Sequence, residues 1–99
     1  MAAPPPSTIT FAIRGPIARG DLPALYGRVC LMLTQSQATL AVCDVTGVAA
    51  DAVSVDALAR LQLAARRHRC RIELRHASAE LRELIAFMGL KDVLVASAR

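Results

Sequence analysis

The chain has 99 residues, of which 55% are hydrophobic and 20% charged, and its formal net charge is +4. A chain of this length forms one domain, and this apolar content excludes a disordered composition. No apolar run approaches the roughly 18 residues of a membrane span, and Met1–Ser7 lacks the regions of a secretory leader. We therefore expect a flexible tail over residues 1–7, a single domain over residues 8–99, and a cytoplasmic protein.

The first half of the chain predicts a strand, a helix and a second strand. Thr8–Arg14 alternates polar and apolar residues, as a half-buried strand does. Asp21 is a candidate helix N-cap, and the apolar stripe in Leu22–Leu33 predicts a helix that ends near Thr34–Gln37. The nearly unbroken apolar run Ala38–Val45 predicts a strand buried on both faces.

A second helix is expected over Val55–Arg69, a stretch rich in alanine, leucine and arginine. Ser54 is its predicted N-cap, and Asp56 lies where a negative charge favours the helix dipole. Gln62 falls on the inner side of this helix. A short strand is then expected over Arg71–Leu74.

The last part of the chain predicts a third helix with clear boundaries. Ser78 is its candidate cap, and the apolar stripe from Leu81 to Met88 has helical spacing. Gly89 followed by Leu90 is typical of a glycine stop with an apolar contact. Val93–Val95 adds a possible last strand. This alternation of strands and helices favours an α/β fold with parallel neighbours.

Three cysteines and two histidines are the candidate reactive residues. Cys30, Cys43 and Cys70 are odd in number and lie in or beside apolar segments, without a C-x-x-C pair. We interpret them as small core residues in a reducing compartment. His68 and His76 have no serine or cysteine placed for a triad. The sequence therefore predicts neither an enzyme nor a metal or other cofactor.

Five segments carry a resemblance to a known family. They are Leu40–Val48, Asp51–Leu58, Arg71–Leu74, Ser78–Leu84 and Phe87–Asp92. In their order and spacing they resemble the STAS domain of bacterial anti-sigma factor antagonists. The resemblance implies an α/β fold with a small mixed sheet of four to five strands and three to four helices packed mainly on one face.

The family's signature is an Asp-Ser-Ser-Gly turn that opens the second helix. Its second serine is phosphorylated by an anti-sigma factor that is itself a GHKL-type serine kinase. Aligned without a gap from Arg71 backwards, Asp51 falls on the aspartate and Ala52 on the first serine. Val53 then falls on the phosphorylated serine and Ser54 on the glycine. Since valine has no hydroxyl, the usual phosphorylation switch is not expected at this position.

The resemblance implies a partner-binding surface at this turn. Its residues are Asp51, Ala52, Val53, Ser54, Val55 and Asp56. Ser54 is either a phosphorylation site displaced by one position or, as we favour, a helix cap. Cys70 replaces the glycine that usually follows the family's second helix, which weakens the expected left-handed cap. The implied function is that of an anti-sigma factor antagonist in bacterial transcription regulation, and a homodimer is possible.

Two other functions remain open at the level of the sequence. The first is a STAS accessory subunit of an ABC-type lipid transporter, which would dock through the same turn. The second is binding of nucleic acid or anionic lipid by a basic cluster. That cluster comprises Arg66, Arg67, His68, Arg69, Arg71, Arg75 and His76. We favour a solvated helix end for it, since no aromatic residue is interleaved for base stacking.

Overall fold

The computed structural model describes residues 8–14 and 17–96, so the tail expected over residues 1–7 lies outside the described residues. Strands and helices alternate, as the sequence predicts. In chain order the elements are β1 (Thr8–Ala12), the 3-10 helix η1 (Arg19–Asp21), α1 (Leu22–Ser36), β2 (Leu40–Asp44), α2 (Ala52–Arg67), β3 (Arg71–Arg75), α3 (Ala79–Phe87) and β4 (Val95–Ala96).

The strands form one sheet in the order β1-β2-β3-β4. Every pairing between them is parallel, so the expected mixed sheet is wrong for the described residues. The physical reason is that a helix follows each of the first three strands and returns the chain to the same end of the sheet. Three of the four described strands have five residues and β4 has two, so the expected four to five strands are reached only when this two-residue strand is counted.

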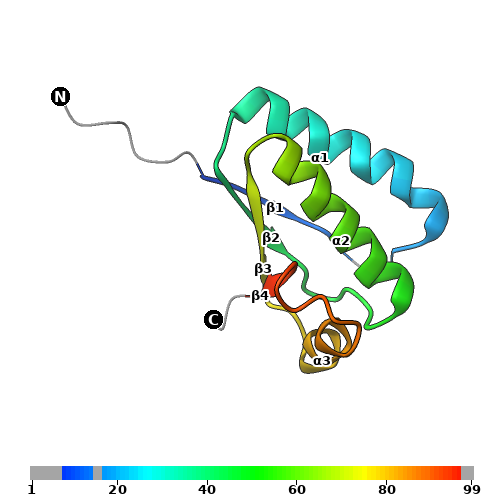
Figure 1. Ribbon diagram of the computed structural model, residues 1–99. Coiled ribbons are helices and arrows are strands. Elements are labelled where there is room, and N and C mark those ends of the chain that lie inside the picture. The colour runs from blue at the N-terminus through cyan, green and yellow to red at the C-terminus, as the bar shows by residue number, and fades with distance from the viewer. Residues whose placement is uncertain (1–7, 15–16, 97–99) are drawn as a thin grey trace.

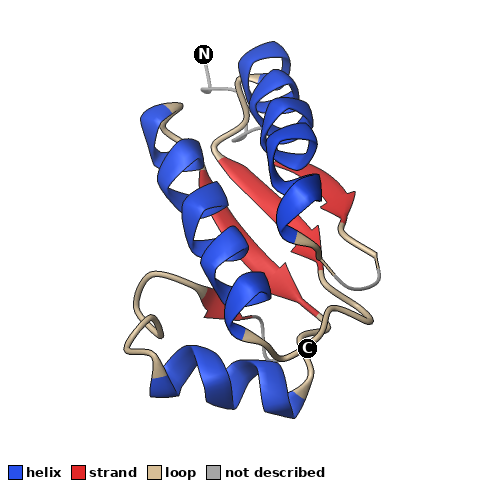
Figure 2. Ribbon diagram, turned by 90° about the vertical axis from the view of Figure 1, so that its right-hand side faces the viewer, coloured by secondary structure: helices blue, strands red, loops and turns tan. Residues whose placement is uncertain are grey.

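The three α-helices lie on one face of the sheet. Figure 2 shows α1 and α2 side by side across the strands, with α3 crossing near the first turns of α2. The sheet residues that face them are buried, as at Cys43 and Leu74, which pair in register. The opposite face carries Thr10, Val42 and Glu73 in one row. Val42 is buried there, although it lies outside the core under the helices.

The start of α2 differs from the sequence prediction. Asp51, not Ser54, is the N-cap: its backbone is extended, and its Oδ1 accepts the backbone N–H of Ser54 at 2.8 Å. The predicted cap at Ser54 is therefore wrong by three residues. An aspartate is as good a cap as serine, and it captures an amide that the helix itself leaves unpaired. Asp21 also differs: it precedes α1, but its side chain makes no capping bond.

The end of α2 is closed by a left-handed residue, as the family pattern requires, but that residue is Arg69. Its φ is 57°, and its backbone N–H donates to the carbonyl of Arg66. The N–H of Cys70 then donates to the carbonyl of Ala65 at 2.9 Å. This pair of bonds is the Schellman motif. The left-handed cap that was expected to be weakened at Cys70 forms one residue earlier, and the Cys70 side chain is buried.

Both predicted boundaries of α3 are confirmed. The hydroxyl of Ser78 accepts the backbone N–H of Leu81 at 3.1 Å, which is the expected N-cap. Gly89 has a φ of 76°, and the N–H of Leu90 donates to the carbonyl of Ile85 at 3.0 Å. The helix therefore ends in a second Schellman motif, with Leu90 packed against the core.

A buried glutamine ties α2 to the sheet. The side chain of Gln62 is 1% exposed. Its Oε1 accepts the N–H of Ile72 at 2.8 Å, and its Nε2 donates to the carbonyl of Ile72 at 2.9 Å. The same Nε2 donates to the carbonyl of Val93 at 2.9 Å. One amide side chain thus holds a helix, a strand and the loop before β4 together.

The cysteines are unpaired thiols in or near the core, as the sequence predicts. Cys43 and Cys70 are buried and Cys30 is partly buried. Burial raises the pKa of the Cys43 thiol to about 12, which keeps it protonated and poorly nucleophilic at neutral pH. Within the described ranges, no helix is both long and apolar enough to cross a membrane.

Candidate functional site

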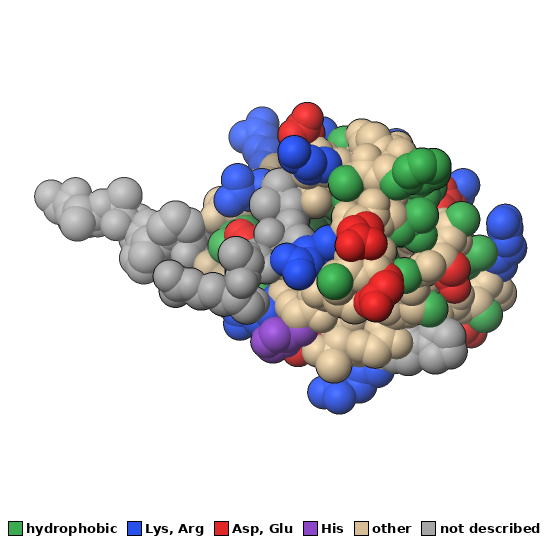
Figure 3. Space-filling view, turned by 90° about the horizontal axis from the view of Figure 1, so that it is seen from below, with side chains coloured by type: hydrophobic (Ala, Val, Ile, Leu, Met, Phe, Trp, Pro, Cys, Tyr) green, Lys and Arg blue, Asp and Glu red, His purple; other side chains and the backbone are tan. Residues whose placement is uncertain are grey.

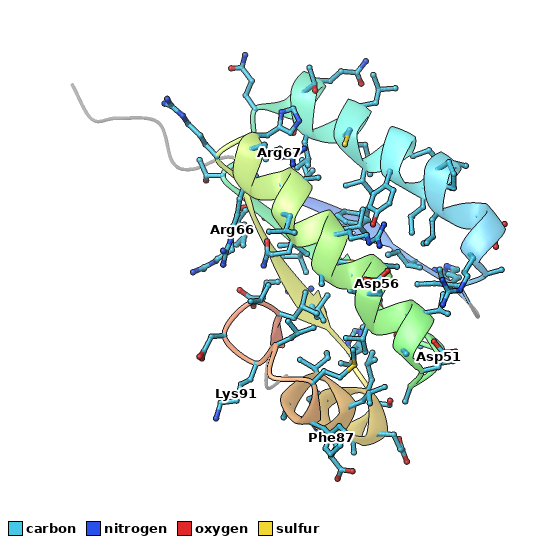
Figure 4. The ribbon with its side chains drawn as sticks, turned by 45° about the vertical axis from the view of Figure 1, so that its right-hand side comes forward. Asp51, Asp56, Arg66, Arg67, Phe87 and Lys91 are labelled. Carbon is cyan, nitrogen blue, oxygen red and sulfur yellow. The ribbon has the colours of Figure 1, made fainter. Side chains whose placement is uncertain are left out.

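The first turns of α2 contain the residues that the sequence singled out, and burial divides them into two groups. Asp51, Ala52 and Asp56 are exposed, and Val53 is partly exposed. Ser54 and Val55 are 0% exposed and pack in the core. Figure 4 shows Asp51 at the beginning of α2 and Asp56 farther along the helix. The side chains available to a partner are therefore those of the first group.

The side chain of Ser54 is closed to solvent. Its hydroxyl oxygen is buried and has no hydrogen-bond partner within the described part of the chain. Its backbone N–H bonds to Asp51, and this bond lowers the pKa of the Asp51 carboxyl. A kinase would reach the hydroxyl only if the start of α2 opened. In the structure, Ser54 therefore contributes its backbone N–H to the N-cap of α2, and its hydroxyl is not exposed for phosphorylation.

The charge of Asp56 is already engaged. Its Oδ2 lies 3.1 Å from Nε of Arg60, one turn later on the same helix face. Both side chains are more than 45% exposed, so the pair is solvent-screened and contributes little to stability. At this turn Asp51 therefore remains the acidic group without a basic partner among the described residues.

The loop between β2 and α2 is held at its start by Asp44. Oδ1 of Asp44 accepts the backbone N–H of Thr46 at 3.0 Å and the Thr46 hydroxyl at 2.6 Å. Oδ2 lies 3.2 Å from Nδ1 of His76, at the end of β3. The Thr46 hydroxyl, followed by its backbone N–H, lowers the pKa of Asp44 to about 2.

This lowered pKa predicts an acid-sensitive contribution to stability. A carboxyl whose pKa is lower in the folded state stabilises the fold above its unfolded pKa, about 4. The contribution is lost as the pH falls through about 2, the folded pKa of Asp44. Thermal unfolding of the wild type and of Asp44→Asn should therefore show a gap in Tm that is full at pH 5 and closes toward pH 2. A gap that stays constant over this range would contradict the prediction.

The basic cluster is divided by the fold. Arg66, Arg67, His68 and Arg69 end α2 and are exposed, and Arg71 follows at the start of β3. Arg75 and His76 lie at the other end of that strand. Figure 4 shows Arg66 and Arg67 at the end of α2 opposite to Asp51. The cluster is thus two separate surfaces.

No arrangement typical of a catalytic or metal site occurs in residues 8–14 and 17–96. This part of the chain has no group of three or more His, Cys, Asp or Glu that could hold a metal ion. His76 contacts Asp44, but the hydroxyl of Thr46 donates to that carboxylate and not to the ring. His68 lies at the far end of β3. Among the described residues, neither histidine is therefore part of a Ser-His or Cys-His pair.

An exposed aromatic residue on α3 was missed as a candidate site residue. Phe87 is 88% exposed, and the neighbouring Met88 is 40% exposed. Met88 was expected in the apolar stripe, but the helix ends at Phe87 and Met88 turns outward. The sequence does contain a signal, because Phe87 falls off the stripe formed by Leu81, Leu84 and Ile85. A large apolar residue on the polar side of a helix is a candidate contact residue.

Comparisons with known proteins agree on the fold. The protein-family model described as "Mlab, STAS domain" matches residues 3–96. A solved structure described as the anti-sigma factor antagonist SpoIIAA in its unphosphorylated form superposes with a TM-score of 0.70 at 14% sequence identity. The superposition covers 93% of this chain and 81% of that one. A search of curated proteins found no match.

Proposed function

Because the chain belongs to the STAS domain family, we propose that it is a protein-docking domain and acts as an anti-sigma factor antagonist in the bacterial cytoplasm. The proposal rests on the side-chain exposure at the start of α2. Ala52 is exposed there and Val53 partly so, on a helix that Asp51 caps rigidly. A rigid, small-residue helix start loses little conformational entropy when a partner covers it. The partner is an anti-sigma factor of the GHKL serine-kinase type.

Binding in this proposal is not controlled by phosphorylation. Val53 occupies the position at which the family carries its phosphorylated serine, and it offers no hydroxyl. The adjacent hydroxyl of Ser54 is buried and unavailable. Partner abundance, rather than a phosphate, would then set the amount of complex.

The test uses the full chain and the serine-kinase anti-sigma factor encoded nearest to its gene. We expect a complex that forms equally with and without ATP, no added phosphate by intact mass, and unchanged binding by Ser54→Ala. Ala52→Arg should abolish binding, because it places a long charged side chain at the centre of the surface. Leu63→Arg, on an exposed residue of the second half of α2, is the matched control. Stoichiometric phosphate on Ser54 would overturn the unswitched mechanism.

A second candidate is an accessory subunit of an ABC-type lipid transporter. One observation favours it: Val53 lacks the hydroxyl on which an antagonist's switch depends. Both candidates use the same surface, so they differ in the protein that is bound. Co-purification of the chain from its own cells with an ATPase subunit, and not with an anti-sigma factor, would favour the transporter.

A further inference from the structure

We propose that Phe87 is a second anchor of the docking surface and inserts into an apolar pocket of the partner that is bordered by lysine or arginine side chains. This inference rests on the proposed function, because it assigns a further contact to the same partner. The surface consists of Glu80, Glu83, Phe87 and Met88 on α3, beside the first turns of α2. Below, these four residues are called the α3 surface.

The exposure of Phe87 is the first observation. With 88% of its area in water, it is the most exposed large hydrophobic side chain among the described residues, and Met88 adjoins it. Figure 3 shows the face of the molecule that is seen from below, where hydrophobic side chains lie beside acidic ones. Aromatic side chains are enriched among the residues that carry most binding energy in interfaces.

The second observation is that Phe87 is held in place and is not at a frayed end. The Schellman motif at Gly89 closes the helix directly after it, and Leu90 packs against the core. The N–H of Met88 also donates to the carbonyl of Leu84 at 2.9 Å. The backbone on both sides of Phe87 is thus fixed by hydrogen bonds. Binding therefore has to order the side chain of Phe87 but not its backbone.

The charges around Phe87 indicate the chemistry of the partner. Glu83 and Glu80 lie four and seven residues before Phe87, on the same face of α3. Both are exposed, and no ion pair engages them within residues 8–14 and 17–96. Arg82 is five residues away, which places it well round the helix from Phe87. An apolar side chain beside two unpaired carboxylates is complementary to a pocket bordered by basic groups.

The α3 surface is continuous with the start of α2. Figures 1 and 2 both place α3 directly beside the first turns of that helix. Asp51 therefore adds a carboxylate on the same side, whereas the arginines at the end of α2 lie at the opposite pole. Arg75, at the end of β3, lies toward this same end of the molecule, so the attraction to a basic partner is local to Asp51 and the carboxylates of the α3 surface.

The experiment places a photo-reactive phenylalanine analogue at one position of the full chain, in the cells that produce it. Position 52 tests the proposed function, position 87 tests the α3 surface, and position 63 on α2 is an exposed control. We expect positions 52 and 87 to cross-link the same partner and position 63 not to do so. The peptide labelled from position 87 should combine apolar residues with lysine or arginine.

The two proposals fail in different ways. Cross-linking from position 52 without position 87 overturns the role of Phe87 and leaves the proposed function standing. Cross-linking from position 87 alone places the contact on α3 and overturns the assignment to the start of α2. If position 63 labels the partner as well as position 87 does, the α3 surface has no special role.

The affinity for the purified partner then measures how much Phe87 contributes to binding. Phe87→Ala should weaken binding about tenfold to a hundredfold, as truncation of an interface anchor does. Its Tm should stay that of the wild type, since the side chain is exposed. Glu83→Lys should weaken binding most at low salt, whereas Arg82→Glu, on the other side of α3, should not. Unchanged affinity of Phe87→Ala would overturn the inference.

Discussion

A Gln62→Leu variant is expected to lose about 3 to 5 kcal/mol of unfolding free energy, because it leaves two buried backbone groups and one partly buried carbonyl without this partner. These groups are the N–H and carbonyl of Ile72 and the carbonyl of Val93. Leucine has nearly the same volume as glutamine, so the cavity term is small and the loss measures the hydrogen bonds. Urea unfolding followed by circular dichroism gives this free energy directly.

The position of Ile72 explains why this side chain matters. β4 pairs with β3 only at Glu73 and Leu74, so Ile72 lies one residue before that ladder begins. The amide of Gln62 accepts from the N–H of Ile72 and donates to its carbonyl, as a neighbouring strand would. A polar group buried in the core is tolerated because all its bonding groups are used.

Leu63→Ala is the matched control for the glutamine. It lies next to Gln62 on α2 but is 53% exposed, so its truncation should change the unfolding free energy by less than about 0.5 kcal/mol. A loss below about 1 kcal/mol for Gln62→Leu would mean that water replaces the side chain at the edge of the sheet. The structural role assigned to Gln62 would then be wrong.

Leu58→Ala is expected to cost about 3 kcal/mol, within the range measured for buried leucines. Leu58 is 1% exposed and lies in the middle of the core that α2 forms with the sheet. The loss combines the transfer of apolar area with the cavity that remains. A domain of this size has a total stability of about 5 to 15 kcal/mol, so the variant should be visibly destabilised at room temperature.

The control for this variant is Leu31→Ala on α1, where the side chain is 57% exposed. It removes the same atoms from a surface position, so its effect should be small. If the two leucine variants lost equal amounts of stability, Leu58 would not be a core residue. Chemical denaturation of both proteins at the same pH and temperature decides between these outcomes.

The sequence was informative wherever a local rule decides the structure. The apolar stripes of α1 and α3, the Ser78 cap and the Gly89 stop were all predicted, because each depends on residues within a few positions of one another. The alternation of elements also predicted the parallel neighbours. At the start of α2, two good capping residues three positions apart compete, and local rules do not choose between them. In the structure, Asp51 is the N-cap.

At the candidate site, too, the sequence predicted what depends on neighbouring residues and not what depends on distant ones. Aligned position by position, the sequence places Val53 where the resemblance implies the phosphorylated serine of the family. It did not show that Ser54 is buried, because burial depends on how α2 sits on the sheet, which is set by contacts between distant residues. Nor did it show that Asp44 reaches His76, 32 positions away.

What the sequence by itself determined is therefore the family, the order of the elements and the absence of a hydroxyl at position 53. Only the tertiary structure decided which residues of the segment Asp51–Asp56 are exposed, and that α3 lies beside the start of α2. It also separated the basic cluster into two surfaces at opposite ends of β3. Periodicity and capping act within one helix or strand, whereas a docking surface is assembled from several elements by long-range packing.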